Sequence, residues 1–163
     1  MTHRLLAAIL LLAVPAVPAR AQAPSPPSDV TAPPVDSMRT PSGLATKLIE
    51  SGKSERKVLP TDLVATHYSL WTTDGKLIDS TRTKNTAVRF PLENVIPGWQ
   101  ECVLLMTIGE KRRCWIPQNL AYNGQKGRPA GMLVVDIELI DARQSPTIPP
   151  PDVAKAPDDA QKT

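Results

Sequence analysis

The sequence predicts an α+β domain in which a twisted antiparallel β-sheet curls around one short α-helix. Several segments in the middle of the chain alternate apolar and polar residues, which is the pattern of strands with one buried face. Residues 97–108 instead repeat apolar residues at spacings of three and four, which indicates an amphipathic helix. Because a helix of about three turns does not persist alone, we expect it to lie against the sheet.

The first 21 residues have the layout of a secretory signal peptide. Arg4 precedes an apolar run that closes on the Ala-Arg-Ala triplet at residues 19–21. The run is short for a membrane span and contains two prolines, so we expect cleavage after Ala21 rather than a stable membrane anchor. Its loss leaves 17 basic residues against 16 acidic ones and lowers the net charge from +3 to +1. We therefore expect an exported protein, periplasmic or secreted, whose net charge says little about its partners.

Two further segments lack the apolar periodicity of a packed domain. Residues 22–42 are rich in Pro, Ser and Ala, and residues 143–163 are similar. Such a composition is typical of extended, disordered arms. The folded part is then expected to be one domain of roughly 100 residues, at positions 43–142.

The first half of this domain contains the clearest strand signals. Residues 43–54 begin as a short strand and run into a glycine turn, and residues 62–72 alternate with Val64, Thr66, Tyr68 and Leu70 on one face. Asp74 and Gly75 then form a hairpin signal between this strand and the next apolar segment, after which AVRFPL resumes the alternation.

The helix follows these strands. Pro97 suits its first position and Gly109 its end, and the apolar stripe consists of Trp99, Cys102, Val103 and Met106. Beyond the helix, EKRRCWIP alternates with Cys114 and Ile116 on one face. A glycine-rich loop comes next, and MLVVDIELIDA closes the domain as a strand with Leu133, Val135, Ile137 and Leu139 inward.

Cysteine and histidine are scarce. The only cysteines are Cys102 and Cys114, and an exported protein could join them in one bridge. We favour two buried free thiols, because the sequence contains no distance information. His67 is the only histidine outside the expected signal peptide, so a metal site lacks ligands, and on a strand this residue is expected to be structural or exposed rather than catalytic.

The usual catalytic constellations are missing from the chain. There is no glycine-rich phosphate loop before a helix, no Ser-His-Asp arrangement in a motif, and no cofactor signature. The basic cluster EKRR is not accompanied by a stripe of basic and aromatic residues, so nucleic-acid binding is not expected. The candidate site residues that remain are Tyr68, Asp79, Phe90, Val95, Ile96, Trp99, Tyr122 and Val135, for most of which plain core packing is the alternative.

Four segments within residues 62–140 together resemble the family of FKBP-type peptidyl-prolyl cis-trans isomerases: HYSLWTTDGKLIDST, VIPGWQECVLLMTIGEKRR, IPQNLAY and MLVVDIEL. A lone Gly-Trp pair would be a weak signal, whereas four motifs in order are a strong one. The signal peptide and Pro-rich arm also resemble the layout of exported bacterial members. The resemblance implies a sheet of five or six strands curled over a short helix, with a proline-binding pocket between them.

The resemblance also assigns roles to residues that match. Trp99 would form the floor under the substrate proline, with Tyr68, Phe90, Val95 and Ile96 as walls. Asp79 and the hydroxyl of Tyr122 would be polar members, and the backbone N–H of Ile96 would bind a substrate carbonyl. The implied activity is peptidyl-prolyl isomerisation, which needs no cofactor. The implied partners are proline-containing unfolded or extended polypeptides, and the macrolide inhibitors of the family.

Some positions depart from the pattern of the family. Ile78 and Val135, expected to contact substrate, replace aromatic residues, and Leu70 and Cys102 replace glycines. The loop after Tyr122 is also shorter than in many members. A smaller aromatic wall could lower turnover, so a proline-segment-binding chaperone or adaptor is the alternative function. A structural domain whose pocket is filled by its own side chains is a third.

Overall fold

The computed structural model describes residues 23–145. The signal peptide expected at residues 1–21 and nearly all of the tail expected at 143–163 lie outside these residues. The elements, in chain order, are β1 (Met38–Arg39), β2 (Ala45–Glu50), β3 (Asp62–Thr72), β4 (Leu77–Ser80), β5 (Val88–Pro91), the 3-10 helix η1 (Leu92–Asn94), α1 (Pro97–Leu104), β6 (Lys111–Ile116), the 3-10 helix η2 (Gln118–Leu120) and β7 (Leu133–Gln144).

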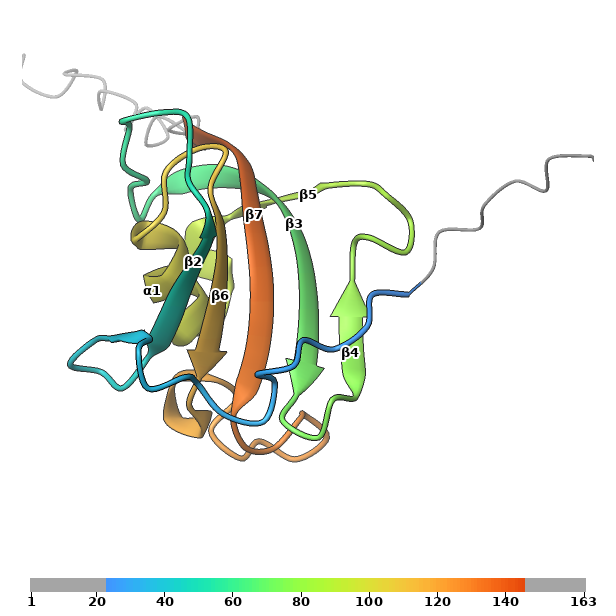
Figure 1. The fold of residues 1–163 in the computed structure, drawn as a ribbon. Coiled ribbons are helices and arrows are strands. Elements are labelled where there is room, and N and C mark those ends of the chain that lie inside the picture. Colours follow the sequence, from blue (N-terminus) through green and yellow to red (C-terminus); the bar gives the residue numbers. More distant parts are fainter. Residues whose placement is uncertain (1–22, 146–163) are drawn as a thin grey trace, which may run out of the picture.

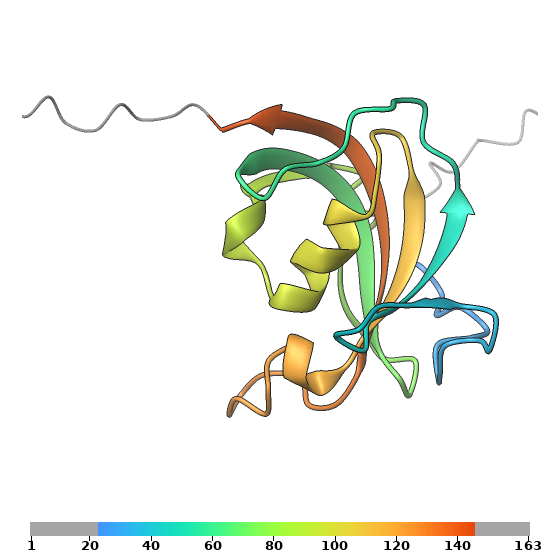
Figure 2. The ribbon, with the colours of Figure 1, turned by 90° about the vertical axis from the view of Figure 1, so that its left-hand side faces the viewer.

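The seven strands form one antiparallel sheet. Its order is β1-β2-β6-β7-β3-β4, and β5 pairs with β3 beside this path. The longest pairing joins β3 to β7, from Asp62↔Gln144 to Thr72↔Leu133, with a register shift between Ala65 and Thr66. The sheet curves, and α1 lies in its hollow (Figures 1 and 2). The predicted α+β class and the helix-on-sheet arrangement are confirmed.

The main core lies between α1 and the concave face of the sheet. The predicted apolar stripe of the helix is buried here. The four residues of β7 that the alternation places inward, Leu133, Val135, Ile137 and Leu139, are also fully buried. The period-two pattern therefore identified the strand face that packs on the helix.

The helix is shorter than predicted. It ends at Leu104, because its last turn tightens: the N–H of Met106 bonds to the carbonyl of Val103 at 2.9 Å, a spacing of three residues. Gly109 then adopts a positive φ of 86° and its N–H bonds to the carbonyl of Leu139 on β7. The helix therefore ends before Gly109, where the chain after α1 forms its first hydrogen bond to β7.

The preference for two free thiols was wrong. Cys102 on α1 and Cys114 on β6 form a disulfide, with their Cα atoms 6.4 Å apart. The helix stripe and the inward face of β6 bring both residues into the same core, where both are fully buried. The bridge ties the single helix to a central strand of the sheet.

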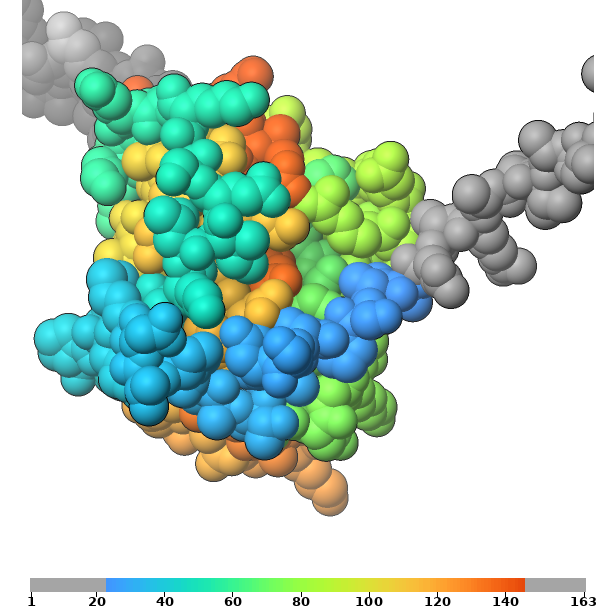
Figure 3. Space-filling view, viewed as in Figure 1, coloured from blue at the N-terminus to red at the C-terminus, as the bar shows by residue number. Residues whose placement is uncertain are grey.

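The face of the sheet away from α1, called the outer face below, is also covered. Residues 23–37, called the N-terminal arm below, run across this face (Figures 1 and 3). Val30 of the arm packs with Ala45, Trp71, Trp115 and Val134 of the sheet in a second apolar cluster. The expectation of a disordered segment at residues 22–42 is therefore corrected for the part that is described, because apolar side chains of the outer face bind it. In residues 23–145 no helix is long and apolar enough to cross a membrane.

Candidate functional site

A cleft of about 720 Å³ opens on the helix side of the sheet, between β3, β4, β5, the start of α1 and the loop that follows η2. Its lining residues are Tyr68, Leu70, Ile78, Asp79, Val88, Phe90, Asn94, Val95, Ile96, Trp99, Tyr122 and Arg128. All the site residues predicted from the sequence belong to this set except Val135. The fold thus brings together residues from both ends of the domain.

Val135 is not placed in the cleft lining. It is fully buried on β7, opposite Leu70 of β3 and Cys114 of β6. Leu70, on the same strand face as Tyr68, lines the cleft instead. Val135 therefore supports the cleft from beneath and has no surface with which to contact a bound chain.

The start of α1 fixes the floor. Pro97 occupies the first turn of the helix, and Gly98 lies against the end of β6 and η2. A Cβ at Gly98 would clash with Cγ2 of Ile116 and lie 3.2 Å from the carbonyl oxygen of Leu120. Only glycine allows this close approach, which fixes the position of the following Trp99 at the floor of the cleft.

Three aromatic rings define the shape of the cleft. Trp99 is 6% exposed and forms the floor. The ring of Tyr68 meets it edge-on, with centroids 4.9 Å apart and planes at 83°, and Phe90 meets it at 6.4 Å and 76°. These T-shaped contacts hold each ring against the next and leave an apolar hollow above the indole.

Tyr68 and Asp79 form the polar pair of the cleft. The Tyr68 hydroxyl donates to Oδ2 of Asp79 at 2.5 Å, while Oδ1 of the same carboxylate accepts from the backbone N–H of Ser80 at 2.8 Å. Burial, together with the hydrogen bond to Asp79, raises the pKa of Tyr68 well above its ordinary value. The phenol stays protonated at physiological pH, and Asp79 is held in one orientation.

A fourth aromatic residue, Tyr122, and a cation lie at the mouth of the cleft. The guanidinium of Arg128 lies over the ring of Tyr122, 5.2 Å from the ring centroid. Among residues 23–145 Arg128 forms no ion pair with an acidic side chain. It is the one basic residue in the lining, so a positive charge faces whatever enters the cleft.

Sequence reasoning missed four lining residues: Leu70, Val88, Asn94 and Arg128. Two of them had a usable signal, because period two places Leu70 on the face of Tyr68 and Val88 on the face of Phe90. Arg128 had none, since its position depends on the loop between η2 and β7, which contains four residues at positive φ: Asn123, Gly124, Gly127 and Gly131.

The cleft offers shape and hydrogen bonds rather than reactive groups. In the described part of the chain no three His, Cys, Asp or Glu side chains converge as a metal site would require. The N–H of Ile96, at the cleft rim, donates to no protein acceptor within residues 23–145. An extended polypeptide could therefore bury an apolar ring over Trp99 and bond its carbonyl to the rim.

The chain is similar to known proteins over this same region. The family model for the FKBP-type peptidyl-prolyl cis-trans isomerase matches residues 54–140. FKBP-type peptidyl-prolyl cis-trans isomerase FkpA of Aeromonas hydrophila is 40% identical over 62% of this chain and 38% of its own length. FK506-binding protein 2 of Candida glabrata is 38% identical over 59% of this chain and 76% of its own length.

Solved structures agree with the sequence comparison. The crystal structure of FkpA from Escherichia coli superposes with a TM-score of 0.63 at 34% identity, over 68% of this chain and 53% of that chain. The structure of AtFKBP13 superposes with a TM-score of 0.57 at 30% identity and is covered over 97% of its length. The chain spans only 38% of the Aeromonas protein and 51% of a 22 kDa FKBP-type isomerase of Escherichia coli, so the match concerns a part of those proteins.

Proposed function

Because the chain belongs to the family of FKBP-type peptidyl-prolyl cis-trans isomerases, we propose that it accelerates rotation about X-Pro peptide bonds in polypeptides. The observation that carries the proposal is the cleft itself. It combines an indole floor, two edge-on aromatic walls and a fixed tyrosine–aspartate pair.

The chemistry suits a site without a nucleophile. Rotation about an X-Pro bond breaks no covalent bond, and its barrier of about 18–20 kcal/mol comes from amide resonance. An apolar cleft removes water from the amide and favours the twisted state, in which the amide is less polarised. Preorganised groups then stabilise the transition state more than the ground state.

Each lining group has a proposed role. Trp99 supports the proline ring, and the hydroxyl of Tyr122 and the N–H of Ile96 bind carbonyl oxygens on either side of the rotating bond. Tyr68 and Asp79 form the polar edge of the ring site, where the high pKa of Tyr68 keeps its hydroxyl neutral. The residues proposed to contact the flanking chain are Ile78, Phe90, Val95 and Ile96.

We propose that the substrates are exported chains. The signal-peptide layout of residues 1–21 supports export, and the Cys102–Cys114 disulfide supports an oxidising compartment such as the periplasm or the medium. Prolines limit the refolding rate of many such chains, which defines a task for an isomerase. Macrolide inhibitors are proposed as ligands of the same cleft, in line with the name of the Candida relative.

The alternative is a module that binds proline segments with little turnover. The observation that favours it is the aliphatic part of the lining, where Leu70 and Ile78 leave one side of the cleft without an aromatic ring. The cleft would then bind a polypeptide but stabilise the twisted amide only weakly.

One assay separates the two functions. The relaxation of a short X-Pro peptide from cis to trans is followed with and without the protein, and binding of the same peptide is measured in parallel. We expect a relaxation rate that rises in proportion to protein concentration. An unchanged rate with a bound peptide would establish the binding module, and the absence of both would reject the proposal for this cleft.

A further inference from the structure

The outer face of the sheet carries a second group of tryptophans. Trp71 of β3 and Trp115 of β6 lie there, next to Val134 of β7, while Trp99 lies on the opposite side in the cleft. Trp71 is 2% exposed and Trp115 is fully buried, because the N-terminal arm covers them. Without the arm, two large apolar rings would face water on one surface.

The arm is held by specific contacts. The indole N–H of Trp115 donates to the backbone carbonyl of Asp29 at 3.0 Å. Arg113 bonds to the carboxylate of Asp29 and also, through Nε and Nη2 at 2.6 and 2.8 Å, to the two oxygens of Asp136. The next residue, Val30, packs its side chain in the apolar cluster with Trp71 and Trp115 and is 9% exposed. The outer face therefore recognises a carbonyl, an acid and a small apolar side chain in series.

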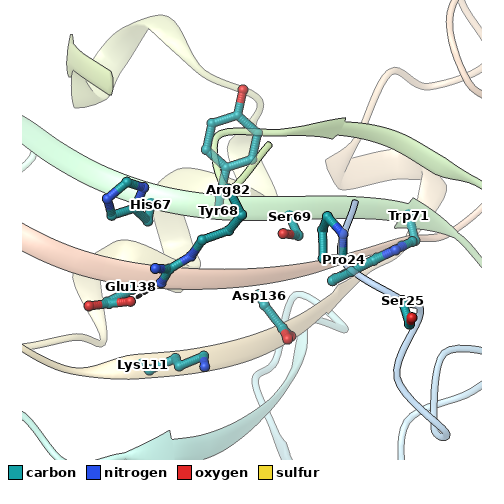
Figure 4. A pocket seen from close by; sticks show the side chains of 10 residues that line it. All are labelled: Pro24, Ser25, His67, Tyr68, Ser69, Trp71, Arg82, Lys111, Asp136 and Glu138. Atoms are coloured by element: carbon teal, nitrogen blue, oxygen red, sulfur yellow. Dashed lines mark hydrogen bonds and ion pairs between the residues drawn. The ribbon is translucent and has the colours of Figure 1, made fainter. Parts of the chain in front are cut away.

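The part of the arm that precedes these contacts is rich in proline. Three of the four residues at positions 24–27 are proline. Pro24 lies beside Trp71 (Figure 4), and Pro26 lies over the turn between β3 and β4, where a Cβ on Gly75 would be 3.4 Å from it. Packing of a proline-rich segment against aromatic rings is a recurring mode of peptide recognition. The arm then turns, with the N–H of Val30 bonded to the carbonyl of Pro27 at 3.1 Å, and this turn presents the Asp29 carbonyl to the indole N–H of Trp115.

The arm does not use the whole surface. The indole N–H of Trp71 is buried and has no hydrogen-bond partner in the part of the chain that the structure describes. Beside Pro24 a hollow of about 160 Å³ remains, with Arg82, Lys111 and Glu138 on its wall (Figure 4). A buried donor without an acceptor is unfavourable, so a bound chain that supplied a carbonyl there would satisfy a group that the arm leaves unpaired.

We propose that the outer face is a second binding surface, for a proline-rich segment followed by a turn with an acidic and a small apolar residue, and that residues 24–30 of this chain occupy it in cis. The surface lies across the sheet from the cleft, and of the residues to which the isomerase activity is assigned only Tyr68 reaches it, at the hollow beside Pro24. The inference therefore holds whether or not the cleft turns over its substrate.

The three tryptophans make a direct test possible in the full chain. Their indole N–H signals are recorded by nitrogen–proton correlation NMR during titration with a synthetic peptide of residues 23–33. A matched peptide carries serine in place of each proline. Signals of Trp71 and Trp115 report the outer face, and the signal of Trp99 reports the cleft.

Two substitutions release the arm without altering the surface beneath it. Val30→Asp puts a charge at the buried position, and Asp29→Lys sets a cation against Arg113. Val35→Asp is the matched control, since it is the same change in the same arm at a fully exposed residue. In the parent, the tethered arm competes at an effective concentration of roughly millimolar, so the peptide binds weakly there.

We expect the peptide to shift the signals of Trp71 and Trp115 in the released variants, with a Kd at least tenfold lower than for the Val35→Asp control, and the serine peptide to bind at least tenfold more weakly. If one of the two released variants fails to fold, the peptide titration of the other variant tests the proposal. The proposal is overturned if the peptide moves only Trp99, if the serine peptide binds equally well, or if folded released variants show no response. Loss of folding in both variants would also overturn it, because the arm would then be a part of the core.

Discussion

On the helix side of the sheet Trp99 lies under an open cleft, whereas on the outer face Trp71 and Trp115 lie under a segment of the same chain. The helix side is braced by a disulfide and by edge-on aromatic contacts. The outer face is closed by one ion-pair cluster and one indole–carbonyl hydrogen bond. The same sheet thus presents tryptophan to two different environments.

The two faces differ in the polar groups that surround a bound chain. The cleft has fixed polar groups at its edge, Asp79 held by Tyr68 and by the N–H of Ser80. On the outer face Arg113 and Trp115 both hold one residue of the arm, Asp29, and neither is part of a cleft into which a proline ring could turn. We therefore propose that the cleft catalyses isomerisation and that the outer face only binds a chain.

The largest expected effect on stability concerns the disulfide between α1 and β6. Replacing both Cys102 and Cys114 with alanine removes the link between α1 and β6, and closure of so short a loop stabilises a protein by about 3 kcal/mol. Val30→Asp, which releases a tethered arm from the outer face, should cost less, about 2 kcal/mol, the contribution of burying one valine side chain. Chemical denaturation of the three proteins measures both values. A larger loss for Val30→Asp would make the arm, and not the disulfide, the main brace of the domain.

The next effect concerns turnover. Asp79→Ala removes the acceptor that orients Tyr68 and should lower kcat/KM by roughly tenfold to a hundredfold, while the free energy of unfolding changes little because this carboxylate is exposed. Asp136→Ala on the outer face is the matched control and should leave kcat/KM unchanged. Equal losses in the two variants would show that the measured rate depends on general stability rather than on the cleft.

A smaller effect concerns substrate choice. Arg128 places an unpaired positive charge at the cleft mouth, so peptides with an acidic residue next to the proline should be favoured over peptides with a basic one. Arg128→Ala should reduce this preference by roughly threefold, the size of an exposed ion pair. Lys126→Ala, in the same loop but outside the lining, should not change it. A ratio of kcat/KM values that is the same in all three proteins would exclude a role for this charge.

The smallest effect is a pH dependence of stability. The pKa of Tyr68 is raised in the folded protein above its unfolded value of about 10. The folded state then holds this proton more tightly, so the stability it contributes is present below pH 10 and is lost as pH rises further. Between pH 10 and 11.5 the free energy of unfolding should fall more steeply for the parent than for Tyr68→Phe. Parallel curves would mean that the Tyr68–Asp79 bond does not persist in solution.

Local patterns predicted the helix side of the molecule well. The alternation of β3 and β7, the Asp74–Gly75 turn and the Pro-Gly-Trp entry to α1 are short-range signals, and the structure has all of them. Most cleft residues followed, because the resemblance placed them on these elements. Val135 was the exception, since periodicity shows which face a residue is on but not whether a neighbour covers it.

The outer face was harder to predict. Trp71, Trp115 and Val134 alternate with the inward residues of their strands, and three apolar side chains on the opposite face indicate a second covering layer. We expected one-sided burial instead, because the composition of the arm resembles that of disordered segments. The disulfide was missed for a related reason, as the distance between α1 and β6 is a property of the tertiary fold.

The most direct test of the assignment compares cis–trans exchange of an X-Pro peptide, measured by exchange NMR, in the parent, Asp79→Ala and Val30→Asp. We expect strong exchange in the parent and in Val30→Asp, and exchange reduced on the order of tenfold or more in Asp79→Ala. If Asp79→Ala exchanges the peptide as fast as the parent while Val30→Asp does not, catalysis does not reside in the cleft and the assignment of the two faces is wrong.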